Sequence, residues 1–137
     1  MKRIEGTSSD PDPYISPDDI SYGDMQMMFS ADLKRGSTEL LILALLEDRA
    51  RHGYEIGKLI EARSGGRLTY SIPSLYPTLC RLEERGLVKG RWVEKAGERR
   101  RRFYQLTREG CAALARERRN WQEFIGVMTH VAGLDNA

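Results

Sequence analysis

The chain has 137 residues, which is enough for one domain with a modest hydrophobic core. It carries 22 lysines and arginines against 20 acids, and 17 of those 22 bases are arginine. No apolar run is long enough to cross a bilayer, and the first ten residues lack the apolar core of a signal peptide, so we expect a cytoplasmic protein without a membrane partner.

The charge is unevenly divided along the chain. Residues 1–32 hold seven acids and two bases, a net charge of −5, whereas the remainder holds 20 bases and 13 acids, a net charge of +7. A basic body favours polyanionic partners, and the planar fork of arginine matches phosphate oxygens and guanine edges. This division predicts a nucleic acid as the partner of the basic part.

Residues 1–32 form an acidic N-terminal extension. Its first half is rich in Pro, Asp and Ser, a composition typical of disorder. Ser16, Pro17, Asp18 and Asp19 then form a helix-start pattern, and methionines and a phenylalanine follow at 25–29. We expect a short helix near 17–30. It either packs against the dimer or folds back on the basic region and inhibits binding, and packing is the favoured prediction.

Residues 33–106 begin with two predicted helices. In GSTELLILALLED, Ser37 is the expected cap, and Leu40–Leu46 are apolar almost all round, which favours a buried helix over a buried strand. A short turn at 48–53 leads to a second helix in YEIGKLIEARSGG, whose end is expected at Gly65 and Gly66. The residues expected to be buried on this second helix are Ile56, Leu59 and Ile60.

A third helix is predicted in IPSLYPTLCRLEERG, starting near Pro73 or Ser74 and ending at Gly86. Pro77 would then lie around the first turn, where amide hydrogens mostly lack intrahelical partners, so both prolines stiffen the start at little cost. Leucines at helical spacing should be buried, namely Leu75, Leu79 and Leu82. The candidate DNA contacts on the other face are Ser74, Tyr76, Pro77, Thr78 and Arg81.

Two strand-like runs follow, at 87–95 and 99–106, around an Ala96-Gly97-Glu98 turn. Trp92 or Val93 is expected to face the core, together with Phe103, Tyr104 and Leu106. Residues 87–108 hold eight bases and two acids, so this hairpin should contact the phosphate backbone. The candidate backbone contacts are Lys95, Arg99, Arg100 and Arg101 of the hairpin and Lys58 of the second helix.

The segment 107–137 is predicted to be one long helix, capped by Thr107 and running to about Val131. Its apolar residues recur in steps close to 3.5, typical of a coiled-coil seam, with Arg118 as an interruption. The apolar stripe is wider than one helix on a small domain normally buries, which indicates a partner helix. The predicted dimer interface, which is also the candidate effector pocket, comprises Leu114, Trp121, Phe124, Ile125 and Met128. A role in the dimer core alone is the favoured interpretation.

This order of elements predicts a mainly α fold with a small β-hairpin: a winged helix-turn-helix with a long C-terminal dimerisation helix. An α-helix of about 10–12 Å diameter fits the major groove of B-DNA, about 12 Å wide, and a basic hairpin can contact the neighbouring backbone. The prediction is therefore a sequence-specific DNA-binding regulator. The alternative is a winged-helix module for protein–protein contact without direct contact to bases.

An enzyme is the least favoured class. Cys80, Cys111, His52 and His130 form no metal-binding spacing, and we find no nucleophilic triad and no phosphate-binding loop. We therefore expect no catalytic residues, no metal and no cofactor.

Three blocks of the chain resemble the PadR family of transcriptional regulators, over about residues 33–120. They are LKRGSTELLILALLEDRARHGYEIGKLIE, SIPSLYPTLCRLEERGLV and GERRRRFYQLTREG, in this order. The resemblance is to the short branch of the family, with a single C-terminal helix. It implies a homodimeric repressor that binds a palindromic operator, with Tyr76 on the recognition helix and the last helix dimerising, and with a small aromatic effector as a candidate partner. The chain differs from the family in its long extension before Leu33 and in Gly97-Glu98 at the hairpin turn.

Overall fold

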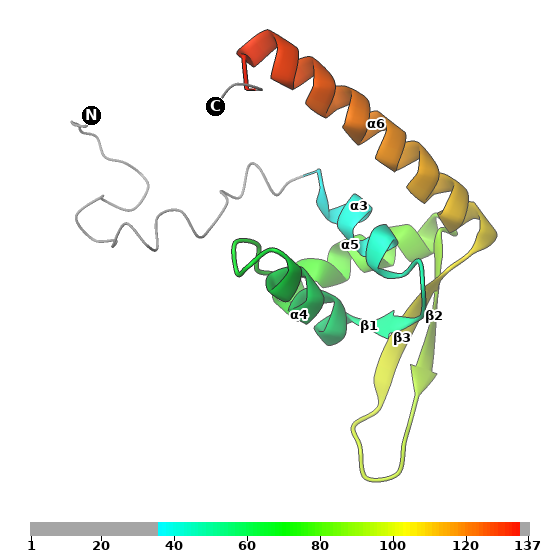
Figure 1. Cartoon of the computed structure of the whole chain (residues 1–137). Helices are drawn as coiled ribbons and strands as arrows, with labels where there is room; N and C mark the ends of the chain where they lie inside the picture. The colour runs from blue at the N-terminus through cyan, green and yellow to red at the C-terminus, as the bar shows by residue number, and fades with distance from the viewer. Residues whose placement is uncertain (1–35, 135–137) are drawn as a thin grey trace, which may run out of the picture.

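The computed structural model describes residues 36–134, so the helix and the disorder predicted within 1–32 lie outside the described residues. The elements are α3 (Thr38–Leu45), β1 (Arg51–His52), α4 (Gly53–Arg63), α5 (Ile72–Glu84), β2 (Val88–Val93), β3 (Arg101–Leu106) and α6 (Arg108–Ala132). Helices α3, α4 and α5 form a cluster, from which the β2–β3 hairpin and α6 project (Figure 1). This is the predicted winged helix with a long final helix.

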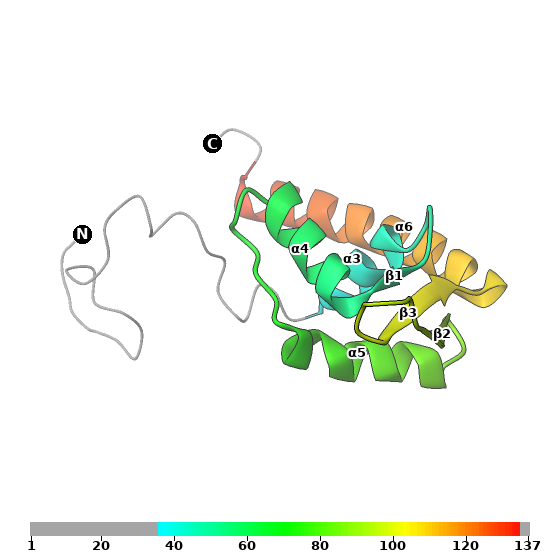
Figure 2. The ribbon, with the colours of Figure 1, turned by 90° about the horizontal axis from the view of Figure 1, so that it is seen from below.

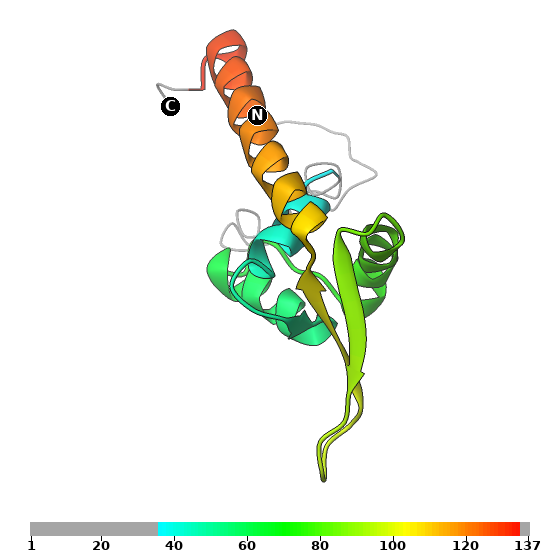
Figure 3. The same ribbon diagram turned by 90° about the vertical axis from the view of Figure 1, so that its right-hand side faces the viewer.

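The hairpin and α6 leave the helix cluster at opposite ends, as the side view shows (Figure 3). Seen from below, α5 lies alongside the hairpin, while α6 lies beyond α3 and α4 on the other side of the molecule (Figure 2). Helix α5 and the basic hairpin therefore share one side of the protein, and most of α6 stands apart from it. None of the helices within residues 36–134 has the length and apolar character needed to cross a membrane.

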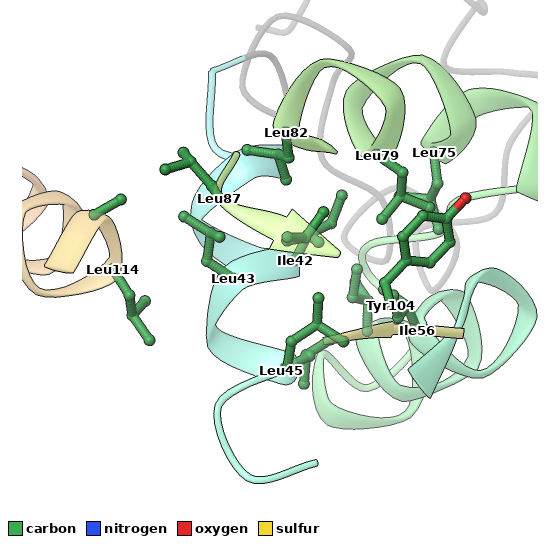
Figure 4. Packing of buried hydrophobic residues seen from close by; sticks show 14 residues of the cluster. Ile42, Leu43, Leu45, Ile56, Leu75, Leu79, Leu82, Leu87, Tyr104 and Leu114 are labelled. Atoms are coloured by element: carbon green, nitrogen blue, oxygen red, sulfur yellow. The ribbon is translucent and has the colours of Figure 1, made fainter. Parts of the chain in front are cut away.

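The core is made by one apolar face from each helix of the cluster (Figure 4). On α5 the predicted residues Leu75, Leu79 and Leu82 are buried, because positions three and four apart share a helix face. Tyr104 of β3 closes the core from the hairpin side and is 3% exposed. On α4 the predicted Ile56 is buried, as is Ile60, and Leu59 is half-buried against the same core.

The small sheet has three strands in the order β1-β3-β2, all antiparallel. Strand β1 lies within the stretch predicted as a turn and pairs Arg51 with Tyr104. The Arg51 side chain is buried, and its guanidinium donates to the Leu45 carbonyl at 2.7 Å and to the Glu55 carboxylate at 2.8 Å. A buried cation needs such partners, because its desolvation is otherwise uncompensated. Arg51 thereby joins the end of α3, the sheet and the start of α4.

The glycine-terminated helix ends match the prediction. Gly65 and Gly66 after α4 and Gly86 after α5 all have positive φ values. At the end of α5, the Gly86 amide donates to Glu83 O at 3.0 Å and the Leu87 amide to Leu82 O at 2.9 Å, which is the Schellman pattern. Ser37 occupies the N-cap position of α3 as predicted, but without a side-chain capping hydrogen bond.

Helix α5 starts earlier than predicted, which changes the position of Pro77. Its N-cap is Ser71, whose side chain accepts from the Ser74 amide, so Ile72 is the first helical residue. Pro77 is consequently the sixth residue and lies inside the helix rather than in its first turn. It has no N–H to donate to the Pro73 carbonyl, so the helix loses one backbone hydrogen bond there.

Within residues 36–134, helix α6 contacts the rest of the protein through its first three turns. The Thr107 hydroxyl accepts from the Gly110 amide at 3.0 Å, the predicted cap, and also donates to the Gly86 carbonyl at 2.6 Å. Leu114 is 2% exposed and belongs to the domain core (Figure 4), so its assignment to the dimer interface was wrong. It is buried because the first turns of α6 pack against α3. One turn further, Arg118 makes two bonds with the Glu47 carboxylate, at 2.9 and 3.1 Å.

Candidate nucleic-acid interface

A hollow of about 220 Å³ lies where α5, the start of α4 and the hairpin meet. Its walls combine aromatic rings with guanidinium groups. The residues that line it include Tyr54, Ile72, Tyr76, Trp92 and Arg99–Arg102. Several of the residues predicted from separate parts of the sequence therefore surround one concave surface.

The exposed face of α5 carries four of its five predicted DNA contacts, namely Ser74, Tyr76, Pro77 and Arg81. Tyr76 is 53% exposed and lies on the side of the helix that faces the hairpin arginines. Ile72, four residues earlier, is 47% exposed on the same face and was missed by the sequence prediction. Its spacing from Tyr76 was the signal that could have identified it.

Thr78 does not face outward, and this prediction was wrong. It is 6% exposed, because it lies three residues after Leu75 and four before Leu82, on the edge of the buried stripe. Its hydroxyl accepts a hydrogen bond from Arg81 Nη2 at 3.1 Å. Thr78 therefore orients Arg81, beside a second hollow that α5 forms with the start of α3.

The predicted hairpin arginines all line the first hollow. Arg99 and Arg100 are exposed, and the Arg100 guanidinium lies 4.4 Å from the centre of the Trp92 ring. Trp92 is 54% exposed, and Val93 and Phe103 are only partly buried and lie outside the core, so the prediction that they face the core was wrong. Alternation along β2 places Trp92 on the face of Tyr104, but beyond the end of the core. The Arg100 guanidinium is held in place by its contact with the Trp92 ring, while its hydrogen-bond donors stay accessible to a ligand.

Arg101 and Lys58 meet at the ring of Tyr54, near the start of α4. The Arg101 guanidinium carbon lies 5.8 Å from the ring centre, and Lys58 Nζ lies 5.7 Å from it. Tyr54 is 50% exposed and was not predicted to take part in the site. Lys95 is exposed near the hairpin tip, where it lines a separate hollow with Glu98, Arg99 and Arg101. The backbone-contact candidates therefore extend from the start of α4 to the hairpin tip.

His52 stands at the centre of this region. Its Nδ1 accepts from the Glu55 amide at 3.2 Å and so caps α4, and its ring meets Phe103 edge-on at 5.0 Å between ring centres. Burial and the nearby positive charge of Arg101 lower the pKa of His52 below its ordinary value. The neutral imidazole is the form that the fold requires, because only an unprotonated Nδ1 can accept this bond.

We expect acid to destabilise the protein through His52. Its folded-state pKa is lowered, so below the unfolded-state pKa, about 6.5, the unfolded chain binds a proton that the folded chain does not. The free energy of unfolding should therefore fall as the pH decreases from about 7.5 to about 5.5, measured by urea titration. His52→Asn keeps a capping side chain that does not titrate, so this variant should lose less stability over the same range. Equal losses would contradict the assignment.

Most apolar side chains of α6 beyond its first three turns are exposed. Of the five predicted interface residues, Phe124, Ile125 and Met128 are exposed, Trp121 is half-buried, and Leu114 lies in the core. Trp121 and Phe124 meet edge-on with ring centres 5.8 Å apart and line a shallow hollow with Asn120. Further apolar residues on the helix and just after it extend this face, namely Val127, Val131 and Leu134.

Within residues 36–134, no group of three or more His, Cys, Asp or Glu side chains is placed to hold a metal ion. The chemistry of the surface is instead that of cations held against aromatic rings. Arginine and lysine groups arranged in this way attract phosphate oxygens.

Comparison with known proteins identifies the family. Residues 42–116 match the model of the transcriptional regulator PadR-like family. The transcriptional regulator Rv3488 of Mycobacterium tuberculosis is 36% identical over 106 residues, which cover 74% of this chain and 95% of that protein. A transcriptional regulator from Clostridium thermocellum has a similar structure, with a TM-score of 0.68 and 29% identity, covering 75% of this chain and 97% of the other.

Bacillus subtilis PadR, solved in complex with operator DNA, shares the fold with a TM-score of 0.54 and 23% identity, covering 59% of this chain and 45% of that one. The family consists of regulators rather than enzymes, in agreement with the sequence prediction. The matched residues run from the first core helix into α6 and include both α5 and the hairpin. The chain belongs to the PadR-like family of transcriptional regulators.

Proposed function

We propose that the protein is a homodimeric repressor that binds a palindromic DNA operator and is released by a small-molecule effector or another signal. The observation that carries the proposal is the convergence of α5, the start of α4 and the arginine-rich hairpin on one hollow face. The complex of Bacillus subtilis PadR with operator DNA, a protein of the same fold, supports this assignment.

In this proposal α5 enters the major groove. Its outward residues Ser74, Tyr76, Pro77 and Arg81 contact base edges or the nearby backbone, while Pro73 and Pro77 limit the motion of its first turns. The hairpin arginines and Lys58 contact phosphates, which give affinity and register but no sequence preference. The buried Thr78 contributes through Arg81, whose guanidinium it holds at 3.1 Å.

A second copy of the chain is the proposed partner of α6. Two apolar α6 faces would pack together and place the two α5 helices about 34 Å apart, one turn of B-DNA, so that each enters one half of a palindrome. Phe124, Ile125 and Met128 are the proposed contacts, and together with Trp121 they are also the candidates for binding a small aromatic effector. A ligand that changes the packing of α6 would change the population of dimers able to bind DNA.

The proposal is tested with two arginine variants on an operator located by footprinting upstream of the protein's own gene. Arg81→Ala should reduce the difference in affinity between operator and unrelated duplexes, because it removes a contact near the bases. Arg100→Ala should weaken binding to all duplexes alike and reduce the slope of log K against log salt by about 1. Fluorescence anisotropy at several salt concentrations measures both quantities.

Arg119→Ala is the matched control, because Arg119 is an exposed arginine on α6, outside the hollow. It should leave affinity and salt slope close to those of the unaltered protein. Identical behaviour of Arg81→Ala and Arg100→Ala would show that the division between base and phosphate contacts is wrong. An unaltered protein that binds no duplex would favour the alternative function, a winged-helix module for protein–protein contact.

A further inference from the structure

One acidic side chain lies among the cations of the proposed DNA-binding face. Glu83 projects from α5 toward the hairpin, and its Oε2 accepts from Arg102 Nη2 at 2.7 Å. The same oxygen accepts from the backbone amide of Gly90 at 3.3 Å. Arg102 belongs to β3 and Gly90 to β2, so one carboxylate oxygen joins α5 to both strands of the hairpin.

The path of the Arg102 side chain depends on the absence of a side chain at position 90. A Cβ on Gly90 would lie 2.7 Å from Arg102 Nε and 2.8 Å from Arg102 Nη2, which is closer than van der Waals contact allows. The guanidinium therefore lies across β2 at Gly90 to reach Glu83. It is also within 5.6 Å of the Trp92 ring centre and 5.8 Å of the Tyr104 ring centre. Arg102 is thus held by a carboxylate and two rings, while Arg99 and Arg100 are exposed.

The position of this contact along the hairpin allows it to restrict the orientation of the hairpin relative to α5. Tyr104 packs the foot of the hairpin into the core, whereas the tip projects away from the helix cluster (Figure 3). The contact of Glu83 begins at the level of Tyr104, which pairs with Gly90, and extends to Arg102, two residues further toward the tip. A connection there limits the angle between the hairpin and α5, and that angle decides whether the tip can contact phosphates while α5 lies in the groove.

We infer that Glu83 is a positioning residue for DNA binding, which holds the hairpin against α5 through Arg102 and Gly90. The inference rests on the proposed DNA-binding function. It adds a role for an acidic side chain at a surface whose proposed phosphate contacts are all arginine and lysine. Without the charge of the carboxylate, the bonds to Arg102 and Gly90 are weaker and the hairpin moves more freely relative to α5. DNA binding would then have to order the hairpin, and the conformational entropy lost in that step would weaken the complex. The intact protein avoids this cost because its hairpin is already held in place.

The direction of the effect separates positioning from simple electrostatics. An acid close to DNA repels phosphates, so its neutralisation alone should strengthen binding. Positioning predicts the opposite result. Glu83→Gln should bind the operator about tenfold more weakly, equivalent to about 1.4 kcal/mol. Its salt slope should decrease by about 1, because fewer hairpin cations reach phosphates at once, although the net charge of the protein has become more positive.

Glu84→Gln is the matched control. It removes the same charge from the neighbouring residue of α5, which is exposed. We expect its operator affinity to be unchanged or slightly higher, with an unchanged salt slope. The double variant Glu83→Lys with Arg102→Glu restores an ion pair with the charges exchanged, and it should recover part of the lost affinity. Glu83→Gln binding as tightly as Glu84→Gln would overturn the inference.

A measurement without DNA tests positioning separately from function. Amide relaxation by NMR on the full chain should show increased motion of Ala96 and Gly97 at the hairpin tip in Glu83→Gln and not in Glu84→Gln. Unchanged tip motion would refute the positioning role even if DNA affinity fell. If the unaltered protein bound no duplex, the proposed function would fail, and the relaxation result would still decide whether Glu83 holds the hairpin.

Discussion

Gly110→Ala is expected to lower the free energy of unfolding by about 3 kcal/mol. A Cβ at this position would lie 2.0 Å from the Leu87 carbonyl oxygen and 3.2 Å from Leu106 Cδ2. The first obstacle is backbone, so no change of rotamer relieves it. The Leu87 carbonyl is also held by the Thr107 amide at 3.1 Å, so α6 itself must move away from the foot of the hairpin.

Gly126→Ala is the control for this variant, because it makes the same substitution on the same helix. A Cβ at Gly126 would meet nothing within 4 Å, so the change should raise the free energy of unfolding by about 0.5–1 kcal/mol through improved helix propensity. Chemical denaturation monitored by circular dichroism measures both variants. Changes of the same sign would contradict the close packing of α6 against Leu87.

Phe124→Glu is expected to convert the proposed dimer into monomers and to lower operator affinity by about 100-fold. Phe124 is 54% exposed on the apolar side of α6, and a carboxylate there would have to be buried unpaired in a dimer. A monomer presents one α5 helix, so it loses the gain in affinity from contacting two half-sites at once, which is on the order of 100-fold or more. Light scattering after gel filtration measures the mass, and anisotropy measures the affinity.

Gln122→Glu adds the same charge two residues away, on nearly the opposite side of the helix, at an exposed position. It should leave both mass and affinity unchanged. A Phe124→Glu protein that stays dimeric and binds its operator normally would exclude this face of α6 as the dimer interface.

The features that the sequence alone determined are those with local causes. The end of α5 at Gly86 follows from a backbone conformation that favours glycine, and the start of α6 follows from the Thr107 hydroxyl three residues before the Gly110 amide. Leu75, Leu79 and Leu82 were predictable as core because their spacing matches one helix face. The order of these elements, with the charge of the hairpin, was sufficient to predict the winged helix, and the resemblance of three sequence blocks indicated the family.

The tertiary structure alone decided where the borderline residues lie. Thr78 stands at the edge of the buried stripe of α5, and whether an edge position is buried depends on the helix packed beside it. Leu114 continues the apolar stripe of α6, and the packing of the first turns of α6 on α3 places it in the core. The strand at Arg51 is too short to produce a pattern and exists because β3 offers a partner edge. The contact of Glu83 with Arg102 joins residues 19 apart in the chain. Periodicity describes one element at a time, whereas these placements depend on how neighbouring elements pack.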